Sequence, residues 1–173
     1  VITIDARIAT AGQGVDPARG PVAVLCAGNS LAAAARGRDF AGFHLLPPLS
    51  ESRAVEITRA AGTGDETIMV TRHFFHAIGK HVIEVEDAPG LVLGRIVSQL
   101  INEASFALQE SVGSASDIDT GVKLGLNYPR GLLEWKDAIG VHQIVATLDA
   151  LQREVGGDRY RVARPLRQAA QHA

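Results

Sequence analysis

The pattern of hydrophobic and polar residues changes its period about halfway along the chain. In the first half, short apolar runs are separated by Gly, Pro and polar residues, which is typical of strands joined by turns. The strands that we predict are residues 1–4, 22–26, 40–46, 54–58 and 81–85. Between them, residues 31–35 and 65–78 are expected to be helical. This loose alternation of strands and helices predicts an open, partly parallel α/β sheet.

From residue 91 onward, apolar residues recur at the spacing of a helix. They predict one long helix, which begins after the turn at Pro89 and Gly90 and carries on its apolar face Ile96, Val97, Leu100, Ile101, Ala104, Ala107 and Leu108. Further helices are expected at residues 114–124, 132–139, 141–155 and 162–170. We therefore predict an α/β domain at residues 1–88, followed by an all-α domain at residues 89–173.

Polar residues mark the starts of two of these helices. Ser30 or Asn29 is expected to cap the helix at residues 31–35, and Ser114 or Ser116 the helix at residues 114–124. A side-chain oxygen at this position accepts a hydrogen bond from a backbone N–H that the helix itself leaves unpaired.

The helical half is expected to self-associate as a homodimer. Its apolar residues are the stripe on the long helix together with Leu133, Ile139, Ile144, Val145 and Leu148. They offer more apolar surface than one small core requires, which is typical of helical domains that pair.

Composition narrows the classes of function and partner. The net charge of −2 gives no basic surface for nucleic acid or for an anionic membrane. Cys26 is the only cysteine, so no internal disulfide can form. Its apolar surroundings favour a buried, inert thiol, in keeping with a reducing, cytoplasmic compartment. Because the first residue is Val and already belongs to a strand-like run, we expect a piece of a longer chain or a processed product.

Two familiar kinds of site can be considered and set aside. Gly12-Gln13-Gly14 resembles the first part of a dinucleotide-binding turn, but Pro17 follows and no strand-to-helix context surrounds it. His73 and His76 are one helical turn apart, with His81 nearby, yet no further ligand at fixed spacing completes a metal site. We expect these histidines to lie at or near the surface and to bind no metal.

The residues best suited to chemistry are His44 and Glu56, which lie in two consecutive strands. A carboxylate that accepts a hydrogen bond from one ring nitrogen fixes the tautomer of the imidazole and raises its pKa. The other nitrogen could then take a proton from an alcohol. From spacing alone, a structural histidine is nevertheless the more frequent arrangement.

The chain resembles the L-3-hydroxyacyl-CoA dehydrogenases, of the 3-hydroxybutyryl-CoA dehydrogenase type, in a set of motifs that follow the family's order. These motifs are Arg38-Asp39-Phe40-Ala41-Gly42-Phe43-His44, Ala54-Val55-Glu56-Ile57, Asp87-Ala88-Pro89-Gly90, Ile101-Asn102-Glu103-Ala104, Ser114-Ala115-Ser116-Asp117 and Gly125-Leu126-Asn127-Tyr128-Pro129-Arg130-Gly131. The resemblance extends from about residue 22 to about residue 160.

This resemblance implies a Rossmann-like domain that binds NAD and a helical domain that completes the acyl-CoA site and forms the dimer. The reaction would interconvert 3-hydroxyacyl-CoA and 3-oxoacyl-CoA. His44 would be the catalytic base, Glu56 its orienting carboxylate, and Ser30 a hydroxyl that helps to hold the substrate 3-oxygen. The His44 imidazole would then have a raised pKa and a hydrogen bond to Glu56.

The chain departs from the family's pattern at three points. Gly94 stands where the family has a substrate-orienting Asn, and Pro47 stands where an Asn usually follows the catalytic His. The first βαβ unit, with its glycine-rich turn, is absent, so the chain alone should bind NAD weakly or not at all. Some bacterial members carry a second, degenerate copy of the helical domain, and the ending of this chain resembles that copy.

Three interpretations therefore remain open. The chain is the C-terminal part of an NAD-dependent dehydrogenase, or a catalytically silent duplicated module for dimerisation or domain packing, or an unrelated α/β binding module. The retained His44 and Glu56 favour the first, whereas Gly94 and Pro47 favour the second.

Overall fold

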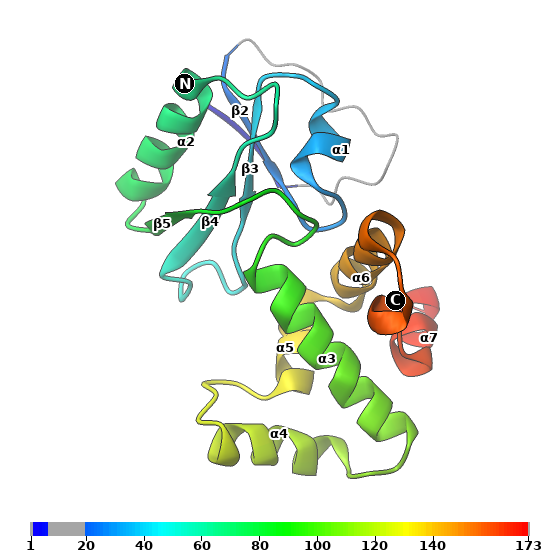
Figure 1. Cartoon of the computed structure of the whole chain (residues 1–173). Coiled ribbons are helices and arrows are strands. Elements are labelled where there is room, and N and C mark those ends of the chain that lie inside the picture. The colour runs from blue at the N-terminus through cyan, green and yellow to red at the C-terminus, as the bar shows by residue number, and fades with distance from the viewer. Residues whose placement is uncertain (1, 7–19, 173) are drawn as a thin grey trace. The chain divides into compact units, whose positions relative to one another are not determined.

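The computed structural model describes residues 2–6 and 20–172 of the 173-residue chain. The chain forms two compact units, Val1–Arg95 and Ile96–Ala173, whose elements are labelled in Figure 1. The turn Gly12-Gln13-Gly14 lies outside the described residues.

A five-stranded sheet forms the first unit, in the order β1-β2-β3-β4-β5. Its strands are β1 (Thr3–Asp5), β2 (Val22–Leu25), β3 (Phe40–His44), β4 (Ala54–Thr58) and β5 (His81–Glu84). The first three are parallel to one another, β4 is antiparallel to β3, and β5 is parallel to β4. The predicted partly parallel α/β sheet is confirmed.

Alternating residues of the strands face two apolar layers on opposite sides of the sheet. On one side, α1 (Leu31–Ala35) and Leu91 pack with Val22, Val24 and Phe40. On the other side, α2 (Asp65–Ala77) supplies Ile68 and Phe75, which pack with Ala23, Ala41, Phe43, Val55, Ile57 and Val82. The two helices therefore cover opposite faces of the sheet, as Figure 1 shows. Period-two alternation between covered faces is expected of such a sheet.

Strand β3 ends at His44, two residues earlier than its apolar run predicts. Pro47 and Pro48 follow closely, and proline has no backbone N–H with which to extend a ladder. The functional candidate His44 therefore stands at the end of its strand.

The described residues 91–172, which include the second unit, contain helices and no strand, and this confirms the all-helical prediction. The elements of the second unit are the part of α3 (Leu93–Gln109) from Ile96 onward, α4 (Ala115–Gly125), α5 (Leu132–Ile139), α6 (Val141–Val155), the 3-10 helix η1 (Asp158–Tyr160) and α7 (Arg164–His172). The first residues of α3, up to Arg95, belong to the first unit.

The apolar residues that predicted self-association are largely used within the second unit itself. Leu133, Ile144, Val145 and Leu148 are buried, together with Ile101 and Leu166, in the core of that unit. They therefore do not supply the free surface on which the dimer prediction rested. Homodimer formation stays a prediction of the family resemblance.

Candidate active site

His44 and Glu56 are brought together by the pairing of their strands. In the antiparallel ladder of β3 and β4, the Cα of His44 is the partner of the Cα of Glu56. Directly opposed residues in such a ladder send their side chains to the same face of the sheet. Both residues are almost fully buried, with exposed fractions of 1% and 3%. The sequence predicted that two adjacent strand ends could bring these residues together. The register does place them opposite each other, with His44 at the end of β3 and Glu56 in the middle of β4.

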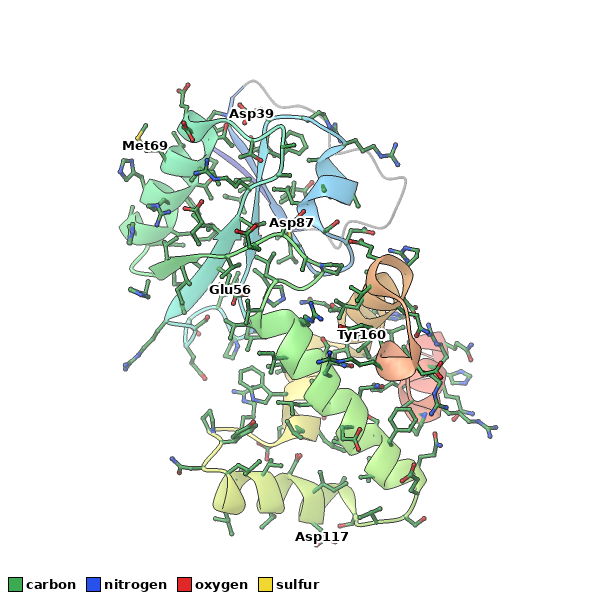
Figure 2. All side chains as sticks on the ribbon, in the orientation of Figure 1. Asp39, Glu56, Met69, Asp87, Asp117 and Tyr160 are labelled. Carbon is green, nitrogen blue, oxygen red and sulfur yellow. The ribbon has the colours of Figure 1, made fainter. Side chains whose placement is uncertain are left out.

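The Glu56 carboxylate is bound to the start of α3. Its oxygens accept hydrogen bonds from the N–H of Val92 at 3.1 Å and from the N–H of Leu93 at 3.1 and 3.0 Å. The first N–H groups of a helix lack partners within the helix, and a negative charge there is stabilised by the helix dipole. Glu56 thus caps α3 from a neighbouring strand, near the helix start seen in Figure 2.

The expected hydrogen bond between His44 and Glu56 is not formed among the described residues. Nδ1 of His44 is buried without a hydrogen-bond partner there. Burial lowers the pKa of the imidazole from 6.5 to about 4, so the expectation of a raised pKa was wrong for this conformation. Burial also raises the pKa of Glu56, against the opposing effect of the N–H groups of Leu93 and Val92. Desolvation therefore dominates at both groups.

The imidazole of His44 lies directly against Gly94 in the first turn of α3. A Cβ atom placed on Gly94 would stand 2.5 Å from Nε2 and 2.7 Å from Cε1 of the ring. From the sequence, Gly94 was noted only as the position where the family has a substrate-orienting Asn. The close contact was missed because the two residues are far apart in the chain and only the folded sheet brings them together.

Ser30 is at the same edge of the sheet, in the loop that follows β2. Its hydroxyl accepts a hydrogen bond of 3.3 Å from the N–H of Ala33 and caps α1, as predicted. The N–H of Cys26, which donates to the carbonyl of Phe43 at 2.9 Å, holds the start of this loop beside the end of β3. The parallel strands β2 and β3 thus present the Ser30 loop and His44 at one edge.

Asp87 is a structural residue of this region that the sequence did not reveal. Its carboxylate accepts hydrogen bonds from the N–H of Leu31 at 2.6 Å and from the N–H of Ala32 at 2.8 Å. Figure 2 shows Asp87 close to α1. Two signals were present in the sequence, the place of Asp87 before a Pro-Gly turn and the motif Asp87-Ala88-Pro89-Gly90, and neither indicates a partner across the fold.

The helix starts of the first unit, where a phosphate of NAD would be expected to bind, carry carboxylates. Helix starts normally bind phosphate through free N–H groups. Here the start of α1 holds Asp87, that of α3 holds Glu56, and the N–H of Gly64 before α2 donates to Asp39 at 2.7 Å. A pyrophosphate at any of these three places would meet a carboxylate.

Among the described residues, neither a metal site nor a reactive cysteine is supported. Among these residues, no group of three His, Cys, Asp or Glu side chains could hold a metal ion. His73, His76 and His81 are exposed, as expected. Cys26 is buried, as predicted, and its burial raises the pKa of the thiol, which favours the unreactive, protonated form. No described helix is both long enough and apolar enough to cross a membrane.

Two family models match the chain in succession. The model described as the 3-hydroxyacyl-CoA dehydrogenase NAD binding domain matches residues 27–88. The model described as the 3-hydroxyacyl-CoA dehydrogenase C-terminal domain matches residues 90–173.

Relatives and solved structures agree with these matches. The 3-hydroxyadipyl-CoA dehydrogenase of Escherichia coli is 40% identical over 118 residues, which are 68% of this chain and 25% of that protein. The 3-hydroxybutyryl-CoA dehydrogenase of Bradyrhizobium diazoefficiens is 35% identical over 130 residues, 75% of this chain and 44% of that protein. The crystal structure of a 3-hydroxybutyryl-CoA dehydrogenase from Escherichia coli is similar with a TM-score of 0.82 and 31% identity, covering 98% of this chain and 35% of that one.

This chain thus spans between a quarter and about half of these relatives. Both domain models match, and their order is that of the sheet unit and the helical unit in this chain. These two matches establish the family. The chain belongs to the 3-hydroxyacyl-CoA dehydrogenase family.

Proposed function

We propose that this chain works as part of an NAD-dependent L-3-hydroxyacyl-CoA dehydrogenase that interconverts 3-hydroxyacyl-CoA and 3-oxoacyl-CoA. Relatives named for 3-hydroxybutyryl-CoA and 3-hydroxyadipyl-CoA support a 3-hydroxyacyl thioester as substrate. The match to an NAD-binding family model supports NAD as the cofactor of the whole protein. Because carboxylates stand at the helix starts of the first unit, the role proposed for this chain concerns the proton and not the hydride.

The observation that carries this proposal is the register of His44 opposite Glu56. Oxidation of a secondary alcohol requires a base to take the hydroxyl proton. At neutral pH the His44 imidazole is uncharged, because its pKa is about 4, and a neutral ring can accept that proton. In this role His44 takes the proton on oxidation and returns it on reduction, Glu56 orients the ring, and Ser30 donates a hydrogen bond to the substrate 3-oxygen.

Two features of the same site favour a second candidate, the catalytically silent module. The Glu56 carboxylate is already engaged by the N–H groups of Val92 and Leu93. The His44 ring is buried against Gly94, and its low pKa makes it a weak base at neutral pH. In that case, the segment serves dimerisation or domain packing, and another part of the full-length protein performs the reaction.

The deciding experiment is acetoacetyl-CoA reduction by the full-length protein carrying His44→Ala. Loss of a working acid–base group should lower kcat by about 100-fold or more. His73→Ala is the matched control, because His73 is an exposed histidine in the same unit and should leave kcat unchanged. Full activity of a folded His44→Ala protein would reject the catalytic role and support the silent module.

A further inference from the structure

The contact between His44 and Gly94 is closer than two ordinary side chains could make. A Cβ on Gly94 would lie 2.5 Å from Nε2, 2.7 Å from Cε1 and 3.1 Å from Cδ2 of the imidazole. Real Cβ atoms essentially never show contacts below 3.0 Å. One edge of the ring therefore occupies the space that any residue other than glycine would need at position 94.

The backbones on both sides of this contact are held in place. His44 belongs to a strand paired with β2 on one side and β4 on the other. The first turn of α3 is tied to β4, because the N–H groups of Val92 and Leu93 bind the Glu56 carboxylate. A side chain added at position 94 would therefore move the imidazole more readily than either backbone.

Nothing in the backbone itself demands glycine at this position. Gly94 lies inside α3 and is not among the glycines with positive φ. Glycine in a helix is normally less favourable than alanine, because it loses more conformational freedom on folding. The steric demand of the His44 ring is thus the physical reason for a glycine here.

We propose that Gly94 is the positioning residue for His44. Because Gly94 has no side chain, the imidazole can lie buried in direct contact with the first turn of α3. Any side chain at this position turns the ring out of that place. The inference concerns the site of the proposed function but does not depend on turnover, so it can fail or hold separately from the proposed reaction.

The buried position of the His44 ring affects its pKa, which can be measured. In its buried place, the imidazole has a pKa of about 4, and desolvation is the cause. An ionisable group on the same face of the sheet is Glu56, which is opposite His44 in the neighbouring strand. A displaced ring would regain water or approach this carboxylate, and either change favours the protonated imidazole. Displacement should therefore raise the pKa of His44 toward its ordinary value of 6.5.

The first test is a pH titration of the His44 ring by NMR, in the full-length protein with histidine-selective ¹³C labelling. The His44 signal is identified by its loss in His44→Ala. With Gly94→Ala, we expect the pKa of His44 to rise by about one unit or more from its low value. Gly121→Ala is the matched control, because Gly121 is a helical glycine of α4 with no atom within 4 Å of an added Cβ. An equal pKa in the parent and Gly94→Ala proteins would overturn the proposal.

The second test asks whether the ring is the group that needs the space. In the protein that retains His44, Gly94→Ala should lower Tm. In the His44→Ala background, the same substitution should raise Tm. The control Gly121→Ala should raise Tm in both backgrounds. If Gly94→Ala alone does not fold, recovery of folding in the double variant supports the proposal. Equal loss of stability in both backgrounds, or failure of the double variant to fold where His44→Ala does fold, would overturn it.

Discussion

At the residue scale, burial determines the pKa of His44 more strongly than the carboxylate of Glu56 in the neighbouring strand. A carboxylate in the opposing strand position would be expected to raise the pKa of an imidazole. The Glu56 charge is instead directed at the N–H groups of α3, and Nδ1 of His44 remains unpaired among the described residues. The ring is therefore neutral and costly to protonate, in spite of the register that places it opposite an acid.

This cost predicts a pH-dependent stability. The unfolded chain binds a proton at His44 near pH 6.5, whereas the folded chain does so only near pH 4. Between these values the unfolded state holds more protons, so the stability contribution is present above pH 6.5 and is lost as pH falls toward 4. A difference of about 2.5 pKa units, at about 1.4 kcal/mol each, gives an upper value of about 3–4 kcal/mol.

Urea unfolding of the parent and His44→Gln proteins between pH 7 and pH 4 measures this effect. We expect the free energy of unfolding to fall more steeply in the parent, because glutamine does not titrate. Glu56 acts in the opposite direction, since its raised pKa stabilises the fold below its ordinary value of 4.5 and costs stability as pH rises through the raised value. It is present in both proteins and cancels in the comparison. Identical slopes would show that His44 is hydrated in the folded state.

At the element scale, carboxylates from elsewhere in the fold complete several helix starts. Glu56 caps α3, Asp87 caps α1, and Asp119 of α4 caps α5. In the last case the N–H of Leu133 donates at 2.8 Å and the N–H of Glu134 at 3.1 Å to a nearly buried Asp119. An unpaired buried N–H is costly, so these bonds stabilise the connection between the two helices.

Asp119→Ala should therefore lower the free energy of unfolding by about 1–3 kcal/mol. Asp137→Ala is the matched control, because Asp137 is an exposed aspartate in the adjacent helix whose ion pair with Lys136 lies at the surface. Its effect should stay within about 0.5 kcal/mol. Chemical denaturation of both variants gives the two numbers, and a similar small effect for Asp119→Ala would mean that water replaces the cap.

These elements also show how far the sequence carries the prediction of this fold. Strands and helices were predicted within a few residues of their observed ends, and Ser30 and Ser114 cap their helices as expected, because periodicity and caps are local signals. The cap on α1 from Asp87 and the contact of His44 with Gly94 depend on residues that meet only in the folded sheet. Local patterns predicted the candidate pair, but not which partners its members use.

At the scale of the whole molecule, the chain carries the fold of its family, with carboxylates at the helix starts of its sheet unit. The N–H groups at the starts of α1 and α3 are bound by Asp87 and Glu56. Before α2, the N–H of Gly64 donates to Asp39, and Asp65 and Glu66 lie in the first turn of the helix itself. In dinucleotide-binding folds, the start of the first helix holds the pyrophosphate through free N–H groups. Carboxylates at these places satisfy the helices and repel an anion.

We therefore expect the 173-residue chain to bind NADH with a Kd above about 1 mM, less than about 4 kcal/mol of binding free energy. Fluorescence titration of NADH measures this, with a cooperative thermal transition by circular dichroism as the check that the chain is folded. The full-length protein is the positive control, since the proposed dehydrogenase must hold its cofactor tightly. Saturable binding in the micromolar range by the folded chain alone would contradict the prediction. If the pyrophosphate bound at the start of α1 or α3, Asp87 or Glu56 would have to leave that helix start, because a pyrophosphate and a carboxylate cannot share the same N–H groups without strong repulsion.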